Sequence, residues 1–261
     1  MNFFQKIPVV RSLYRYIREI VRDAPLEEFA NYDEYWDARI RENRVAPVLD
    51  RYVQIASRVR PNASLLDIGC GEGAFLQYMR KARPDCRLAG ADISSYSVAH
   101  LLQNGIEAKL IAPGQRVKDA CGNGWDVVVL MEVIEHIVDA EETIRQVVEL
   151  EPAQIFITVP NVGFMLYRLR LMFGSRFPIT SIFYHMKEHV RFWTVKDFRQ
   201  WSEVNGLQVI ACVPQIDRGD QLVRFLARLS PSMFADRVVY ELRVRVARNE
   251  QPSIDSETLR G

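Results

Sequence analysis

Cysteine is scarce in this sequence, and the few cysteines are scattered. The four among 261 residues, Cys70, Cys86, Cys121 and Cys212, show neither C-x-x-C spacing nor the density of a disulfide-stapled secreted domain. We therefore expect a reducing, cytoplasmic setting.

Long apolar runs and an excess of charge of one sign are also missing. No run reaches the roughly 18 to 20 apolar residues that a membrane-spanning helix needs, and the N-terminus lacks the pattern of a secretory signal. We therefore expect neither an integral membrane protein nor an exported one. The 34 Lys and Arg residues nearly cancel the 33 Asp and Glu residues. Because phosphate contacts require clustered positive charge, this balance argues against a nucleic-acid partner.

Residues 1–60 are predicted to form a helical N-terminal extension. Over residues 3–22, apolar and basic side chains alternate at helical spacing, which indicates a basic amphipathic helix. This helix would pack on its own domain, mediate homodimerisation, or attach the protein peripherally to the inner face of an anionic membrane. Residues 26–60 are expected to add helices that cap the substrate side.

Beyond residue 60, short β-branched runs alternate with amphipathic helical stretches, a pattern typical of a parallel sheet with helices on both faces. The expected strands are 64–68, 87–93, 106–112, 125–131, 154–159, 207–213 and 238–247. The clearest helices are 73–82, 94–103, 139–150 and 194–204. The last strand alternates apolar and charged residues, as a half-exposed antiparallel strand does. We predict an α/β domain over 61–248 with a seven-stranded, mostly parallel sheet and a disordered tail over 249–261.

The strongest motif is a buried strand that runs directly into a glycine-rich turn, Leu65-Leu-Asp-Ile-Gly-Cys-Gly-Glu-Gly73. Glycines let the backbone approach a ligand closely, and the helix that follows offers unpaired N–H groups. The G-x-G-x-G spacing differs from the G-x-G-x-x-G of dinucleotide enzymes, which disfavours a nicotinamide oxidoreductase. Asp92 ends the second predicted strand, where a carboxylate can accept hydrogen bonds from both ribose hydroxyls of an adenosine.

D-x-G-C-G-x-G followed by Asp92 resembles the class I methyltransferases, which use S-adenosyl-L-methionine, release S-adenosyl-L-homocysteine and have a Rossmann-like fold. The resemblance implies that the glycine motif holds the methionine part of the cofactor and that Asp92 holds the ribose. The full set assigned to the cofactor is Asp67, Gly69, Cys70, Gly71, Gly73, Asp92, Ile93, Met131 and Glu132. The turn after the third strand, Ala112-Pro-Gly-Gln115, lacks the acid that often lies beside the adenine, so that contact stays unassigned.

The fourth predicted strand ends in Met131-Glu-Val-Ile-Glu-His136. Ligands of open α/β sheets lie beyond the carboxyl ends of the strands, so these residues should flank the cofactor. The resemblance implies that this exit lies near the transferable methyl group, with Glu132 and His136 as catalytic candidates. An imidazole titrates near neutrality, which suits His136 to act as a general base. Alternatively, Glu135 and His136 brace the helix that follows.

His189, in Glu188-His-Val-Arg-Phe-Trp-Thr194, is a further candidate base. The E-x-x-E-H sequence plus a distant histidine resembles the metal-binding set of small-RNA 2′-O-methyltransferases and of some ubiquinone-pathway O-methyltransferases. A divalent metal would then be held by Glu132, Glu135, His136 and His189. Because H-x-x-F-W-T is also widespread among metal-free relatives, where the histidine braces a loop, we expect no metal.

A later series of motifs, P-N-x-G, R-x-R and G-x-R-x-P-x-T, is similar to the MetW family over residues 64–210. The chain departs from that family in its E-x-x-E-H sequence and in its additions at 1–60 and 215–261. We expect a stand-alone enzyme that O-methylates a small molecule, a saccharide or a lipid-linked intermediate. The alternative is a MetW-like regulatory partner of a biosynthetic acyltransferase. The stretch 164–183 is either a lid or a helix with Phe164, Leu166, Leu169 and Met172 inward.

Overall fold

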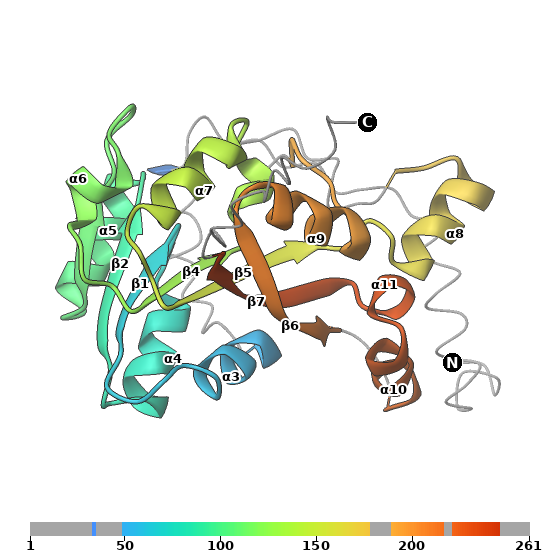
Figure 1. Ribbon diagram of the computed structural model, residues 1–261, viewed down its shortest axis with the longest axis horizontal. Helices are drawn as coiled ribbons and strands as arrows, with labels where there is room; N and C mark the ends of the chain where they lie inside the picture. The colour runs from blue at the N-terminus through green and yellow to red at the C-terminus, as the bar shows by residue number, and fades with distance from the viewer. Residues whose placement is uncertain (1–32, 35–48, 178–188, 217–220, 246–261) are drawn as a thin grey trace, which may run out of the picture.

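A seven-stranded sheet organises the part of the chain that the computed structural model describes, residues 33–34, 49–177, 189–216 and 221–245 (Figure 1). The strands lie in the order β3-β2-β1-β4-β5-β7-β6. Their bounds are β1 Ser64–Ile68, β2 Arg87–Asp92, β3 Glu107–Leu110, β4 Val127–Met131, β5 Gln154–Pro160, β6 Leu207–Gln215 and β7 Arg237–Val244. Only β7 runs antiparallel to its neighbours, β5 and β6. The predicted Rossmann-like sheet with an antiparallel last strand is therefore confirmed.

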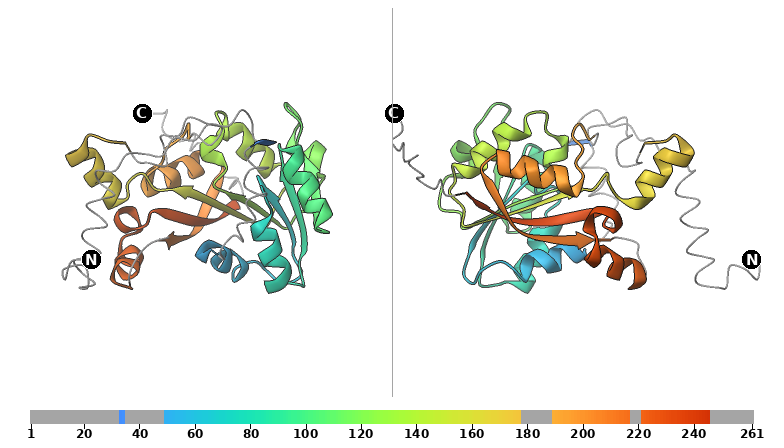
Figure 2. Two further views of the ribbon diagram at one scale, coloured as in Figure 1. Left: turned by 180° about the vertical axis from the view of Figure 1, so that it is seen from behind. Right: turned by 45° about the vertical axis from the view of Figure 1, so that its right-hand side comes forward.

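Helices cover both faces of the sheet, as Figures 1 and 2 show. The helices are α3 Asp50–Ala56, α4 Ala74–Ala82, α5 Ser95–Gln103, α6 Val117–Cys121, α7 Ala140–Val148, α8 Met165–Gly174, α9 Val195–Val204, α10 Gln221–Leu229 and α11 Pro231–Phe234. One core cluster joins α3, α4 and α5 to one face, and another joins α6, α7 and α9 to the other. Strands β4 and β5 are buried almost throughout, because their side chains are apolar on both faces.

The predicted helices are confirmed to within two residues, and three of them begin at capping side chains. The Ser94 side chain accepts a hydrogen bond from the Ser97 N–H at the start of α5, and the Asp139 side chain accepts one from the Glu142 N–H at the start of α7. Thr194 and Asp197 form a reciprocal capping box on α9. Strand β3 is shorter than predicted.

Helix α8 shows where the apolar pattern of the sequence misleads. Met172, predicted to face inward, is 65% exposed, whereas Phe164 is buried. Arg170 is 2% exposed instead, and its Nε donates a hydrogen bond to the Phe177 carbonyl at 2.8 Å. The inward prediction for Met172 is wrong because a polar side chain with a local hydrogen-bond partner occupies the buried position.

Several predictions concern residues outside the described ones: the amphipathic helix over 3–22, most of 26–60 and the tail over 249–261. Within the described part of the chain, no helix combines the length and the apolar character needed to cross a membrane. All four cysteines are free thiols.

Candidate active site

The glycine-rich turn joins β1 to α4 at the carboxyl edge of the sheet. The Gly69 N–H donates to the Ala91 carbonyl at 2.7 Å, which binds the turn to β2. Gly69 and Gly73 both have φ of +74°, a region that other residues rarely adopt. A Cβ at Gly69 would collide with the Val133 side chain, and one at Gly73 would lie 2.8 Å from Leu101 Cδ1. Both positions therefore require glycine.

Asp67 lies beneath this turn with an unsatisfied oxygen. Its side chain is buried, and its Oδ1 atom has no hydrogen-bond partner among the described residues. Burial, followed by the nearby charge of Asp92, holds the pKa of Asp67 well above its usual range. A buried carboxyl group of this kind fits a ligand that brings a cationic donor, such as the ammonium group of an amino acid. Burial also raises the pKa of the neighbouring Cys70 thiol.

Asp92 ends β2 and is held in one orientation by backbone donors. Its Oδ2 accepts from the Gly71 N–H at 2.8 Å, and its Oδ1 accepts from the Ser94 N–H at 2.9 Å. Burial raises the pKa of Asp92, and these hydrogen bonds oppose that effect. Each oxygen keeps acceptor capacity for a hydroxyl donor. Ile93, next in the chain, is 59% exposed and offers apolar surface beside the carboxylate, so the pair fits an adenosine.

Glu132 follows Met131, the half-buried last residue of β4, and adopts a φ of +55°, unusual for a residue with a side chain. Hydrogen bonds to Thr158 and Arg237 hold it there. Its N–H donates to the Thr158 Oγ1 at 3.0 Å, and its carboxylate accepts from that hydroxyl at 3.0 Å and from the Arg237 Nε at 2.8 Å. Burial alone would raise the pKa of Glu132, but the charges of Arg237 and Arg51 outweigh it and lower the pKa.

Glu135 lies in a single 3-10 turn over Ile134–His136. Unlike Glu132, it has a carboxyl group without hydrogen-bond donors among the described residues. Its side chain is 1% exposed, and neither carboxyl oxygen has a hydrogen-bond partner among the described residues. Burial, followed by the charge of Glu132, raises the pKa of Glu135 well above its usual range. Its carbonyl oxygen accepts from the Val190 N–H at 2.9 Å and from the Arg191 N–H at 3.1 Å. These bonds bring the segment after His189 onto this turn.

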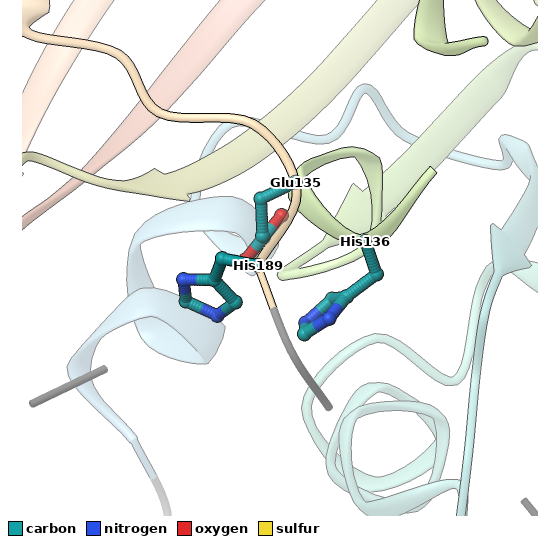
Figure 3. Close-up of side chains that lie close together, drawn as sticks. All are labelled: Glu135, His136 and His189. Carbon is teal, nitrogen blue, oxygen red and sulfur yellow. The ribbon is translucent and has the colours of Figure 1, made fainter. Parts of the chain in front are cut away.

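Glu135, His136 and His189 converge at this point, as Figure 3 shows. The two imidazole rings lie edge to face with their centroids 4.7 Å apart. One ligand atom from each of the three residues lies within 4.8 Å of the others. The fourth member of the predicted metal set, Glu132, binds Arg237 and Thr158 instead.

Flanking contacts explain why His189 is held in place. The guanidinium group of Arg191 pairs with Glu141 of α7 at 2.6 Å, and its Nε donates to the Val138 carbonyl at 3.0 Å. Trp193 packs against Trp201 of α9, with ring centroids 5.1 Å apart. The H-x-x-F-W-T motif therefore anchors the histidine segment between two helices.

The structure places the predicted residues in two groups along one sheet edge: Asp67, Asp92 and the glycine turn in one, and Glu135, His136 and His189 in the other. Sequence analysis missed Arg237, which reaches Glu132 because Pro160 of β5 pairs with Arg237 at the start of β7. No local pattern indicates this pairing, since Glu132 and Arg237 are 105 residues apart.

Comparisons with known proteins agree with this arrangement. The model of a family described as a methyltransferase domain matches residues 36–211. The ubiquinone biosynthesis O-methyltransferase of Pseudoalteromonas translucida is 28% identical over 153 residues, which cover 56% of this chain and 64% of that relative. The enzyme of the same name from Pseudomonas entomophila is 25% identical over 187 residues, which cover 67% of this chain and 78% of that relative.

A solved structure extends the likeness to the fold. The TehB-like SAM-dependent methyltransferase from Corynebacterium glutamicum has a TM-score of 0.54 and 15% identity, covering 82% of this chain and 98% of that one. The family match spans more than half of the sequence and contains the glycine turn, Asp92 and the Glu135, His136 and His189 cluster. This chain belongs to the methyltransferase-domain family, and its fold is that of the class I S-adenosylmethionine-dependent enzymes.

Proposed function

We propose that this protein transfers a methyl group from S-adenosyl-L-methionine to a hydroxyl oxygen of a small molecule, a saccharide or a lipid-linked intermediate. The observation that carries the proposal is the convergence of two imidazoles and a buried carboxyl group at the edge where the glycine turn lies. The two relatives named above are O-methyltransferases by name, which supports oxygen as the acceptor atom.

In this proposal, the residues of the first group hold the cofactor. Asp67 would accept from the ammonium group, Asp92 would accept from the ribose hydroxyls, and the glycines of the 69–73 turn would let the cofactor approach the backbone closely. Ile93 and Met131 would supply apolar surface. When bound, the cofactor supplies an electrophilic methyl group and leaves as S-adenosyl-L-homocysteine.

The second group handles the proton. The imidazole of His136 or His189 would accept the proton of the acceptor hydroxyl when that oxygen takes up the methyl group. The Glu135 carboxyl group, buried beside both rings, would stabilise the imidazolium that forms. Glu132, with its carboxylate engaged by Arg237, would fix the end of β4 and thereby position this group.

The experiment is methyl transfer by the double variant His136→Ala, His189→Ala, assayed against a panel of hydroxylated acceptors. The panel includes intermediates of ubiquinone biosynthesis, because the relatives carry that name. Loss of a general base should lower the rate by about 10² to 10⁴ while binding of S-adenosyl-L-homocysteine persists. The matched control is His100→Ala, which alters a half-buried histidine on α5. Wild-type rates in the double variant would exclude both histidines.

A second candidate role for the same three residues is to hold a divalent cation. The 4.8 Å cluster and the unsatisfied oxygens of Glu135 favour this role, since two imidazoles and a carboxylate are a common ligand set for such ions. The ion would acidify the acceptor hydroxyl, and the histidines would act as ligands instead of bases. Chelator treatment distinguishes the two: lost activity that divalent cations restore supports the metal, and unchanged activity supports the base.

The N-terminal extension is the basis for our proposals on oligomeric state and membrane contact. Its basic amphipathic pattern over residues 3–22 supports either homodimerisation or peripheral contact with the inner face of a membrane in a cytoplasmic protein. Light scattering and co-sedimentation with anionic vesicles, each with and without residues 1–22, would separate these roles. The alternative of a non-catalytic acyltransferase partner is not favoured, because the matching relatives are named as methyltransferases.

A further inference from the structure

Asp33 comes from the chain before α3 and contacts the first turn of α5. Its carboxylate accepts a short hydrogen bond from the Ser94 hydroxyl. It also accepts from the Ser95 hydroxyl at 3.2 Å and from the Tyr96 N–H at 3.4 Å. A carboxylate at this place satisfies donors at the start of a helix, where its charge is favoured. Asp33 precedes residues 36–211, so the family match does not include it.

Ser94 joins Asp33 to the ribose end of the proposed cofactor site. Its hydroxyl donates to Asp33 and accepts from the Ser97 N–H, while its own N–H donates to Asp92 Oδ1 at 2.9 Å. Two carboxylates, those of Asp33 and Asp92, thus each accept a hydrogen bond from Ser94. The hydrogen bond from Ser94 lowers the pKa of Asp33, which therefore stays ionised at neutral pH.

We propose that Asp33 is a positioning residue for the cofactor ribose. By holding Ser94 and the start of α5, Asp33 fixes the donor that orients Asp92, the carboxylate assigned to the ribose hydroxyls. Without Asp33, the Ser94 hydroxyl loses its acceptor and Asp92 gains freedom to turn, so that binding has to order it again. This inference rests on the proposed function, because it requires an adenosine at Asp92.

The test compares two probes, S-adenosyl-L-homocysteine and 5′-methylthioadenosine, by calorimetric titration of the full chain. The second probe keeps the ribose and adenine but lacks the amino-acid part. Asp33→Ala should raise the dissociation constants of both probes by the same factor, about three- to tenfold, the loss expected for one ordinary intramolecular hydrogen bond. Asp67→Asn should weaken only S-adenosyl-L-homocysteine. The neighbouring control Glu34→Ala should change neither by more than about twofold.

Two further variants separate positioning from a general loss of structure. Asp33→Asn keeps an acceptor oxygen for Ser94 and should recover at least half of the lost affinity. Adding Asp33→Ala to Ser94→Ala should weaken binding no further than Ser94→Ala alone, because both changes break one link. Wild-type affinity in Asp33→Ala, or fully additive losses, would overturn the inference. If the unaltered protein binds neither probe, the proposed function fails as well. If the unaltered protein binds both probes tightly and Asp33→Ala leaves their affinities unchanged, this inference alone is overturned.

Discussion

Replacing Glu135 by methionine should stabilise the protein while abolishing methyl transfer. Glu135 is 1% exposed, and neither of its carboxyl oxygens has a partner among the described residues, so the folded state bears an uncompensated desolvation cost. An unsatisfied buried polar group costs about 1–3 kcal/mol, and methionine fills a similar volume without it. We expect a gain of that size at pH 8, which for a chain of this length raises the melting temperature by roughly 2 to 12 °C.

The pH dependence of the gain follows from the raised pKa of Glu135. Because the folded-state pKa lies above the unfolded value, the protonated carboxyl group favours folding at low pH, and this contribution is lost as the pH rises through the folded-state pKa. The advantage of Glu135→Met should therefore grow between pH 5 and pH 8, as measured by urea unfolding. The control Glu203→Met, at an exposed site on α9, should stay within about 0.5 kcal/mol of wild type. A destabilised Glu135→Met that still transfers methyl groups would refute the reasoning.

Three further predictions concern the surrounding framework. Gly69→Ala should lower the free energy of unfolding by about 2–4 kcal/mol and abolish S-adenosyl-L-homocysteine binding. The reason is that Gly69 has a φ of +74° and that an added Cβ would collide with the Val133 side chain. Chemical unfolding measures the first effect and calorimetry the second. Arg237→Met should cost about 3 kcal/mol in urea unfolding, because it removes the guanidinium group that pairs with the Glu132 carboxylate; a neutral effect would contradict the role given to this pair. Burial raises the pKa of Asp236 to about 7. The free energy of unfolding of the wild type should therefore fall, relative to that of Asp236→Asn, by up to about 4 kcal/mol between about pH 4 and pH 7. Parallel curves of unfolding free energy against pH for the two proteins would refute this.

The sheet and the cofactor residues could be predicted from sequence because their signals are local. Strands β4 and β5 are mostly apolar runs rich in β-branched residues, and three glycines in five residues indicate the conformation of the turn. Asp92 follows the same logic, since the carboxyl ends of neighbouring parallel strands must meet at one edge.

The second group was only partly predictable, because its arrangement depends on contacts between distant segments. The sequence indicates His136 and His189 as alternative bases and as members of a disfavoured metal set. The left-handed conformation of Glu132, a residue with a side chain, leaves no mark in the sequence. In that conformation Glu132 binds Arg237 of β7, and it is not one of the three residues whose ligand atoms converge. The prediction of which side chains of α8 face inward is wrong for a related reason, since the buried Arg170 makes a hydrogen bond that no periodic pattern reveals.

The most direct test of the account is a titration of the purified chain with S-adenosyl-L-homocysteine, run beside NADH as a comparison. We predict saturable binding of the nucleoside, no binding of NADH, and loss of the nucleoside signal in Asp92→Ala. A wild-type chain that shows no heat with S-adenosyl-L-homocysteine, or that binds it equally well without the Asp92 carboxylate, would contradict the assignment of this sheet edge as a cofactor site.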